Sequence, residues 1–163
     1  MSLVRNAARG VLAAGAGTLA MDLLWYARYR RGGGTGSFWG WETAAGVKSY
    51  DKAAAPAQVG RKAYKALTGD DPPPDTARLM TNAVHWSTGM QWGAVYGIAA
   101  PHLKQPWAAL AFAPVVWGSS YVILPALGVY KPIWKYDAKT LWQDFSAHLV
   151  YGSVTTGIVA LER

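Results

Sequence analysis

The chain has 163 residues, of which 52% are hydrophobic and 15% charged, and it contains 9 Trp and no Cys. The charged fraction lies below the roughly 25% of typical soluble proteins, and a charge-poor, Trp- and Gly-rich composition favours a membrane protein. The lack of Cys excludes disulfides, thiolate metal sites and Cys nucleophiles. The net charge of +7 does not predict nucleic-acid binding, because the basic residues gather between apolar runs.

Four apolar runs are each long enough to cross a hydrocarbon layer of roughly 30 Å as a helix. They cover residues 7–27, 82–100, 106–127 and 140–161. The first run holds a single acid, Asp22. The sequence therefore predicts an all-α fold: a polytopic protein with four transmembrane helices in one membrane domain that takes in the whole chain.

Residues 28–80 form a basic loop between the first two runs. Its GGGTG segment lacks the Lys that a phosphate-binding loop needs after the last Gly, so a flexible linker is expected. APAQVGRKAYKALTG predicts a short amphipathic helix at about 56–68, with Pro56 in its first turn and Gly69 at its end. This helix either lies on an anionic lipid surface or caps the bundle. The basic residues expected to meet lipid are Arg28, Arg30, Arg31, Arg61, Lys62 and Lys65.

The distribution of Lys and Arg predicts an orientation. Twelve of them lie in the 28–80 and 128–139 loops, whereas the two ends of the chain and the 101–105 loop hold four: Arg5, Arg9, Lys104 and Arg163. The positive-inside rule then places the large loop in the cytoplasm and both termini outside.

Three runs carry small residues at a spacing of four, a pattern that lets two helix backbones approach closely. The stripes are Gly10, Ala14, Thr18 and Asp22 in the first run, His85, Gly89, Gly93 and Gly97 in the second, and Asp144, His148, Gly152 and Thr156 in the fourth. We expect these faces to pack helices, within the chain or against a partner.

The second and fourth runs align around their histidines, as HWSTG against HLVYG. In a four-span protein these two helices run in the same direction, so His85 and His148 should lie at similar depth near the cytoplasmic side. A repeat of two hairpins, 7–100 and 106–161, is the resulting hypothesis.

Ionisable groups inside a membrane span are by default a hypothesis for function. The candidate polar cluster is His85, His148, Asp144, Asp22 and Asn82. Its members could lock packing through interhelical hydrogen bonds or form a proton relay or pH sensor. They could also ligate a heme between two imidazoles or bind a divalent metal. No cofactor is required by the first two alternatives, and none is predicted outright.

Several segments resemble the YagU-like family of small bacterial inner-membrane proteins. They are PAQVGRKAYKALTG, TNAVHWSTGMQWGAVYG, LPALGVYKP and DFSAHLVYG, and the resemblance covers roughly residues 10–157. It implies a polytopic fold in the inner (plasma) membrane of a bacterium. It brings no catalytic role for the histidines, because the family is largely uncharacterised.

The sequence contains no G-x-S-x-G or H-E-x-x-H motif. The leading hypothesis is therefore a protein without evident catalysis, which binds a helix or lipid as an accessory subunit of a larger membrane complex. Its expected partners are membrane lipids and either another membrane protein or a second copy of the chain.

Overall fold

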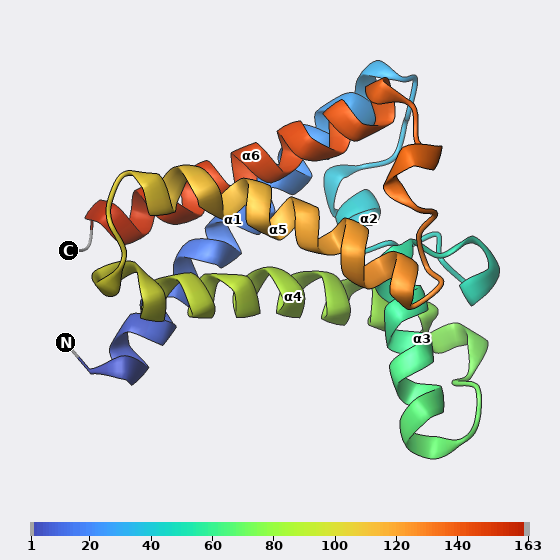
Figure 1. The fold of residues 1–163 in the computed structure, drawn as a ribbon. Coiled ribbons are helices and arrows are strands. Elements are labelled where there is room, and N and C mark those ends of the chain that lie inside the picture. Colours follow the sequence, from blue (N-terminus) through green and yellow to red (C-terminus); the bar gives the residue numbers. More distant parts are fainter. Residues whose placement is uncertain (1, 162–163) are drawn as a thin grey trace.

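The computed structural model describes residues 2–161, so Arg163, one of the residues that set the expected orientation, lies outside them. The described chain is all-helical and contains no strand, which confirms the all-α prediction. Its elements are α1 (Leu3–Arg31), α2 (Phe38–Glu42), α3 (Ala55–Thr68), α4 (Ala77–Ala99), α5 (Trp107–Ala126) and α6 (Ala138–Leu161). The four long helices form a bundle with both termini at one end and the short helices α2 and α3 at the other (Figure 1).

Local signals set several helix ends. Ser2 caps α1, since its hydroxyl accepts a hydrogen bond from the Arg5 backbone N–H at 3.4 Å. The α3 helix has Pro56 in its first turn and ends at Gly69, whose φ of 85° is left-handed and favours glycine. The α2 helix, capped by Ser37, follows the glycine-rich segment expected to be a linker and was not predicted.

The α1 helix packs against both α4 and α6 and runs antiparallel to α4. Gly10, near the start of α1, lies against Gly93 in the second half of α4, while Asp22, farther along α1, contacts His85 in its first half. A Cβ added to Gly10 would lie 2.7 Å from the Gly93 carbonyl carbon. The two backbones thus approach as closely as the glycine stripes predict.

An adjoining face of α1 packs against α6, again antiparallel. Gly17 lies against the Tyr151 backbone, and farther along α1 the Arg28 guanidinium donates to the Gln143 carbonyl oxygen at 2.6 Å. Because α1 is antiparallel to both partners, α4 and α6 run in the same direction. They therefore present corresponding residues at corresponding ends of the bundle.

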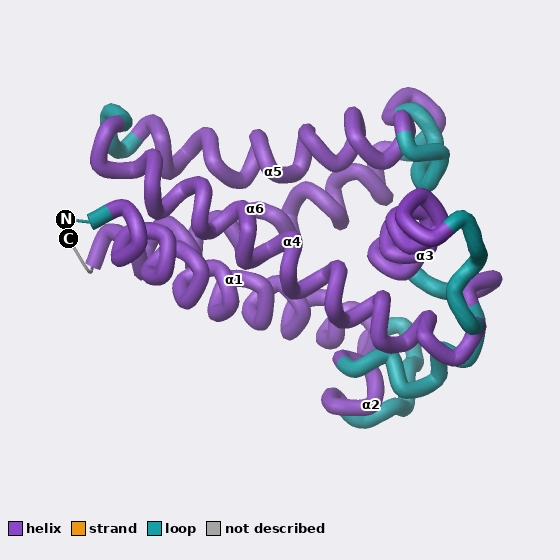
Figure 2. The backbone as a smooth tube through the Cα atoms, turned by 90° about the horizontal axis from the view of Figure 1, so that it is seen from below, coloured by secondary structure: helices purple, strands orange, loops and turns teal. Residues whose placement is uncertain are grey.

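The α5 helix runs along the bundle (Figure 2) and packs against α6. A cleft lies between α5 and α4. Gly152 on α6 permits the close approach, because a Cβ there would lie 2.5 Å from that of Ala113. Near the α4–α5 hairpin, Tyr96 and Phe112 bridge the cleft with their ring centroids 4.7 Å apart.

The basic loop folds over the end of the bundle. Gly60 of α3 packs against Met80 and Val84 of α4. Arg78 Nε and Asn82 Nδ2 both donate to the Thr43 carbonyl oxygen, at 2.9 and 3.0 Å. These contacts fasten the segment after α2 and the whole of α3 to the first half of α4.

The distribution of apolar side chains differs from that of a water-soluble bundle. Between residues 2 and 161 no Leu, Ile, Met or Trp is buried; the core consists mainly of Gly, Ala, Thr and Tyr. Large apolar side chains face outward instead, and Leu12 and Val122 are 73% and 71% exposed. Of the four expected spans, α1 and α5 have the length and hydropathy to cross a membrane, while α4 and α6 reach only the length.

Candidate functional site

A cavity of about 440 Å³ brings both predicted histidines together. It lies toward the α3 end of the cleft and is lined by residues from α1, α4, α5 and α6 and by the start of α3. Its polar lining residues are Thr18, His85, Thr88, Ser119, Ser120, Tyr130, Asp144, His148 and Tyr151. Two members of the predicted cluster, Asp22 and Asn82, do not line it.

His85 is oriented by a buried carboxylate. Its Nε2 lies 2.9 and 3.0 Å from the two oxygens of Asp22, which is only 4% exposed. A carboxylate only accepts hydrogen bonds, so Nε2 carries the proton. The other ring nitrogen, Nδ1, bonds to no residue of the described chain, and it is not buried.

Glu42 extends this pair toward α2 and was not predicted as a site residue. Its Oε1 accepts a hydrogen bond from the Trp86 indole N–H at 3.2 Å, while its Oε2 is buried without a donor. Burial and the adjacent Asp22 carboxylate raise the pKa of Glu42. A negative charge on Glu42 is therefore disfavoured next to Asp22, and this pair of carboxyl groups lies beside His85.

His148 has an equivalent arrangement on α6. Its Nδ1 lies 2.9 Å from the Asp144 carbonyl oxygen and 3.5 Å from Asp144 Oδ1, so Nδ1 is the donor. The Tyr121 hydroxyl donates to Asp144 Oδ2 at 2.9 Å and fixes this carboxylate. Nε2 of His148 is thus a hydrogen-bond acceptor in the neutral ring. It also lacks a partner in residues 2–161 and is not buried.

The two histidines lie at the same level of the bundle. The Tyr151 hydroxyl on α6 donates to the Gly89 carbonyl oxygen on α4 at 2.7 Å. His85 lies one turn before Gly89, and His148 lies one turn before Tyr151. Because α4 and α6 are parallel, both imidazoles lie on the same side of this contact, and both line the same cavity.

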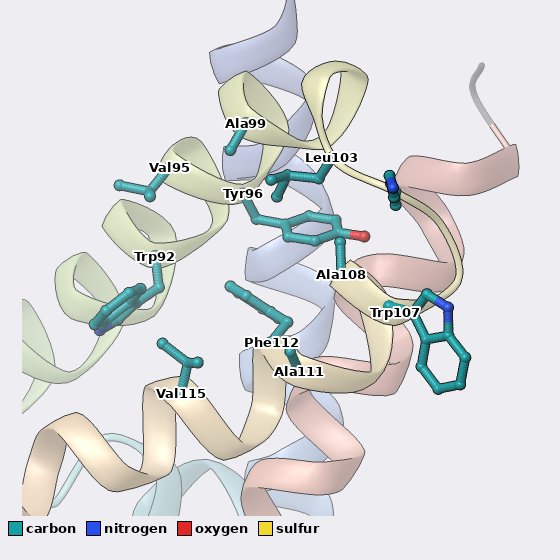
Figure 3. Close-up of a pocket in the computed structure, with 11 residues that line it drawn as sticks. Trp92, Val95, Tyr96, Ala99, Leu103, Trp107, Ala108, Ala111, Phe112 and Val115 are labelled. Carbon is teal, nitrogen blue, oxygen red and sulfur yellow. The ribbon is translucent and has the colours of Figure 1, made fainter.

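A second cavity, of about 460 Å³, extends the cleft toward the α4–α5 hairpin. Trp92 lines both cavities, and Val115 of the second precedes Val116 of the first. The second cavity is almost wholly apolar, with side chains of α4 facing those of α5 (Figure 3). The cleft thus has a polar half at the histidines and an apolar half beyond Trp92.

The other candidate residues have partners within the chain. Asn82 holds the turn after α2 and does not reach the histidines. Gly89 lies against Thr18 and Gly93 against Ala14, Gly97 lies against Gly10, and Thr156 is buried. In the described part of the chain, no three of His, Asp and Glu are grouped to hold a metal ion, so the metal alternative lacks a third ligand.

Four of the basic residues expected at a lipid surface are held by protein groups, and one of them is Arg30, which donates to the Gly36 carbonyl oxygen at 3.3 Å. Arg28 also donates to the Ser146 hydroxyl at 2.8 Å and lies over the Trp25 ring. Arg61 and Lys65 both pair with Asp71, at 2.9 and 3.1 Å. These two side chains form an exposed salt bridge at the end of α3, which partly neutralises the face expected to meet anionic lipid.

Comparison with known proteins identifies no relative from which a function could be inferred. The expected relation to the YagU-like family stays a prediction. No known protein family, no curated protein and no solved structure matches this chain.

Proposed function

We propose that the protein is a four-span membrane protein that binds a lipid-like small molecule in the cleft between α4 and α5. The observation that carries the proposal is the cavity lined by His85 and His148, each with an accessible ring nitrogen that bonds to no described residue. Polar groups set into an otherwise apolar concave site are typical of small-molecule recognition. The apolar half of the cleft provides room for a chain attached to the bound head group.

The large apolar side chains that face outward from the long helices, such as Leu12, Leu110 and Val122, support the membrane setting. Lower hydropathy in α4 and α6 is consistent with spanning, because these helices contribute the partly buried polar residues His85, Asp144 and His148 to the cavity. The positive-inside pattern then directs α2 and α3 to the cytoplasm and the termini outward, in a bacterial inner membrane.

Binding of a small molecule is favoured over binding of a partner helix. The glycine faces that motivated a helix partner are filled within the chain, since Gly10, Gly93 and Gly152 each contact another helix of the same bundle. The cleft, in contrast, is unfilled by described side chains along both of its cavities. An accessory subunit of this kind would contribute a bound ligand to its complex.

Cavity filling tests this proposal. Ala111 lines the apolar cavity, whereas its neighbour Leu110 points away from it and is exposed. We expect the wild type and Leu110→Trp, released in native lipid discs, to retain one small molecule at a fixed ratio, detected by mass spectrometry of extracts. Ala111→Trp should lose it. Extracts identical to bulk membrane lipid in all three proteins would refute the proposal.

A pH-sensing element is a second candidate, favoured by one specific arrangement. Glu42 anchors the end of α2 to Trp86, and its pKa is raised by burial and by the Asp22 carboxylate that also orients His85. Deprotonation of Glu42 would place two negative charges together and weaken the docking of α2. Hydrogen exchange of α2 that is independent of pH, after correction for intrinsic rates, would exclude this role.

A further inference from the structure

We infer the chemical class of the ligand: a neutral, long-chain phenol or hydroquinone whose hydroxyl donates a hydrogen bond to Nε2 of His148. The inference rests on the proposed function, because it names what occupies the same cleft. It follows from three properties of the lining, namely its charge, its hydrogen-bonding groups and its shape.

The charge of the lining disfavours an anionic head group. The residues that line the two cavities include one basic side chain with a full charge, Lys104, and it lies in the apolar cavity far along the chain from the histidines. The polar cavity has neither Lys nor Arg but does contain Asp144. A phosphate or carboxylate taken out of water here would meet a like charge and no fixed cation, which is strongly unfavourable.

Several hydrogen-bonding groups of the polar cavity accept, while the hydroxyls of Thr18, Thr88 and Tyr130 can also donate. Nε2 of His148 is an acceptor because Nδ1 already donates to Asp144. The hydroxyls of Ser119 and Tyr151 already donate to the Val116 and Gly89 carbonyl oxygens, both at 2.7 Å, so their oxygens can only accept a further hydrogen bond. A ligand hydroxyl can donate to the accepting groups and accept from the donating ones, whereas a methyl ether can only accept.

The shape of the cleft fits a ring followed by a chain. Trp25, Trp92, Tyr130 and Tyr151 line the polar cavity and present aromatic faces and edges to its contents. Beyond Trp92, the apolar cavity of about 460 Å³ accepts an alkyl or prenyl chain. A hydroxylated ring with such a chain matches both halves, whereas a flexible diacyl lipid would leave the aromatic walls without a planar partner.

A competition experiment tests the class directly. The protein in detergent is mixed with equal amounts of para-dodecylphenol, para-dodecylanisole and dodecyl phosphate, and native mass spectrometry reports which is bound. The phenol and the anisole differ in the hydroxyl proton, so we expect the phenol to be favoured by roughly tenfold. Preference for the phosphate, or equal binding of phenol and anisole, would overturn the inference. Binding of none of the three would instead count against the proposed function.

Two variants of His148 locate the acceptor. His148→Asn keeps a donor near the Nδ1 position but removes the outer nitrogen, whereas His148→Gln keeps a polar atom near Nε2. We expect the preference for phenol over anisole to vanish in Asn and to persist, weakened, in Gln. His102→Asn, in the exposed α4–α5 turn, is the matched control. If His148→Asn still prefers the phenol over the anisole, the role of His148 is overturned. If a variant fails to fold, the ratio of phenol to anisole bound by the wild type still decides the ligand class.

Discussion

The contact of Gly10 with α4 provides the sharpest test of the bundle. In Gly10→Ala the new Cβ would lie 2.7 Å from the Gly93 carbonyl carbon and 3.1 Å from Gly97 Cα. Both are backbone atoms, so no side-chain rotation relieves the overlap. The closest atom to the new Cβ is the Gly93 carbonyl oxygen, so restoring ordinary contact at 3.4 Å requires α1 and α4 to separate by more than about 1 Å. A gap of that size forfeits about half or more of the local dispersion energy.

The free energy of unfolding should therefore fall by about 2–3 kcal/mol in Gly10→Ala. Gly118→Ala is the matched control, since a Cβ at Gly118 meets no atom within 4 Å, and replacing a helical glycine there should stabilise α5 by up to about 1 kcal/mol. Titration with SDS in mild detergent, followed by far-UV circular dichroism, measures both changes. Equal midpoints for the two variants would refute the close packing of α1 on α4.

Three further predictions concern the polar groups. The pKa of Glu42 is raised in the folded protein, so the stabilising contribution of its protonated carboxyl group is present below pH 4.5 and is lost as pH rises through the folded-state pKa. Thermal unfolding between pH 4.5 and about 8 should therefore show that the wild type loses stability relative to Glu42→Gln. A stability difference that stays constant with pH would contradict this reasoning. Asp22→Asn leaves His85 with a neutral partner in a buried setting and should lower the free energy of unfolding by about 3 kcal/mol; a loss below about 1 kcal/mol would show that the pair is not coupled. Tyr151→Phe removes the hydrogen bond to Gly89 and should lower it by about 1 kcal/mol in the same SDS titration, whereas unchanged stability would place that bond outside the folded core.

Helices whose signals are local could be predicted from the sequence. Pro56 and Gly69 mark the ends of α3 because each restricts the backbone at its own position. The ends of α1 were less accessible, since hydropathy identifies the apolar part of a helix and α1 continues through Arg28, Arg30 and Arg31. The α2 helix escaped detection because its five residues are too few to show a period, and its position depends on contacts with α1 and α4.

The site was only partly accessible for a similar reason. Asp144 lies four residues before His148, so one helix turn brings them together. Asp22 and His85 are 63 residues apart, and only the matching stripes on two helices hinted at their contact. Glu42 gave no signal, because its partner lies on another element. The cavity could not be predicted from the sequence. It exists because α5 packs closely against α6 at Gly152 and does not pack closely against α4.

The sideways opening of the cleft has a consequence for how a ligand would reach the histidines. Val95 and Val115, on opposite walls of the apolar cavity, are 56% and 54% exposed, so the cavity communicates with the surface between α4 and α5. In a bilayer that surface faces acyl chains. A ligand would arrive by diffusing laterally, and occupancy would follow its mole fraction in the membrane instead of its concentration in water. Each additional methylene stabilises the ligand in the membrane by about 0.8 kcal/mol. Chain length would therefore determine how much ligand is present in the bilayer, while the ring and its hydroxyl would determine which ligand is bound.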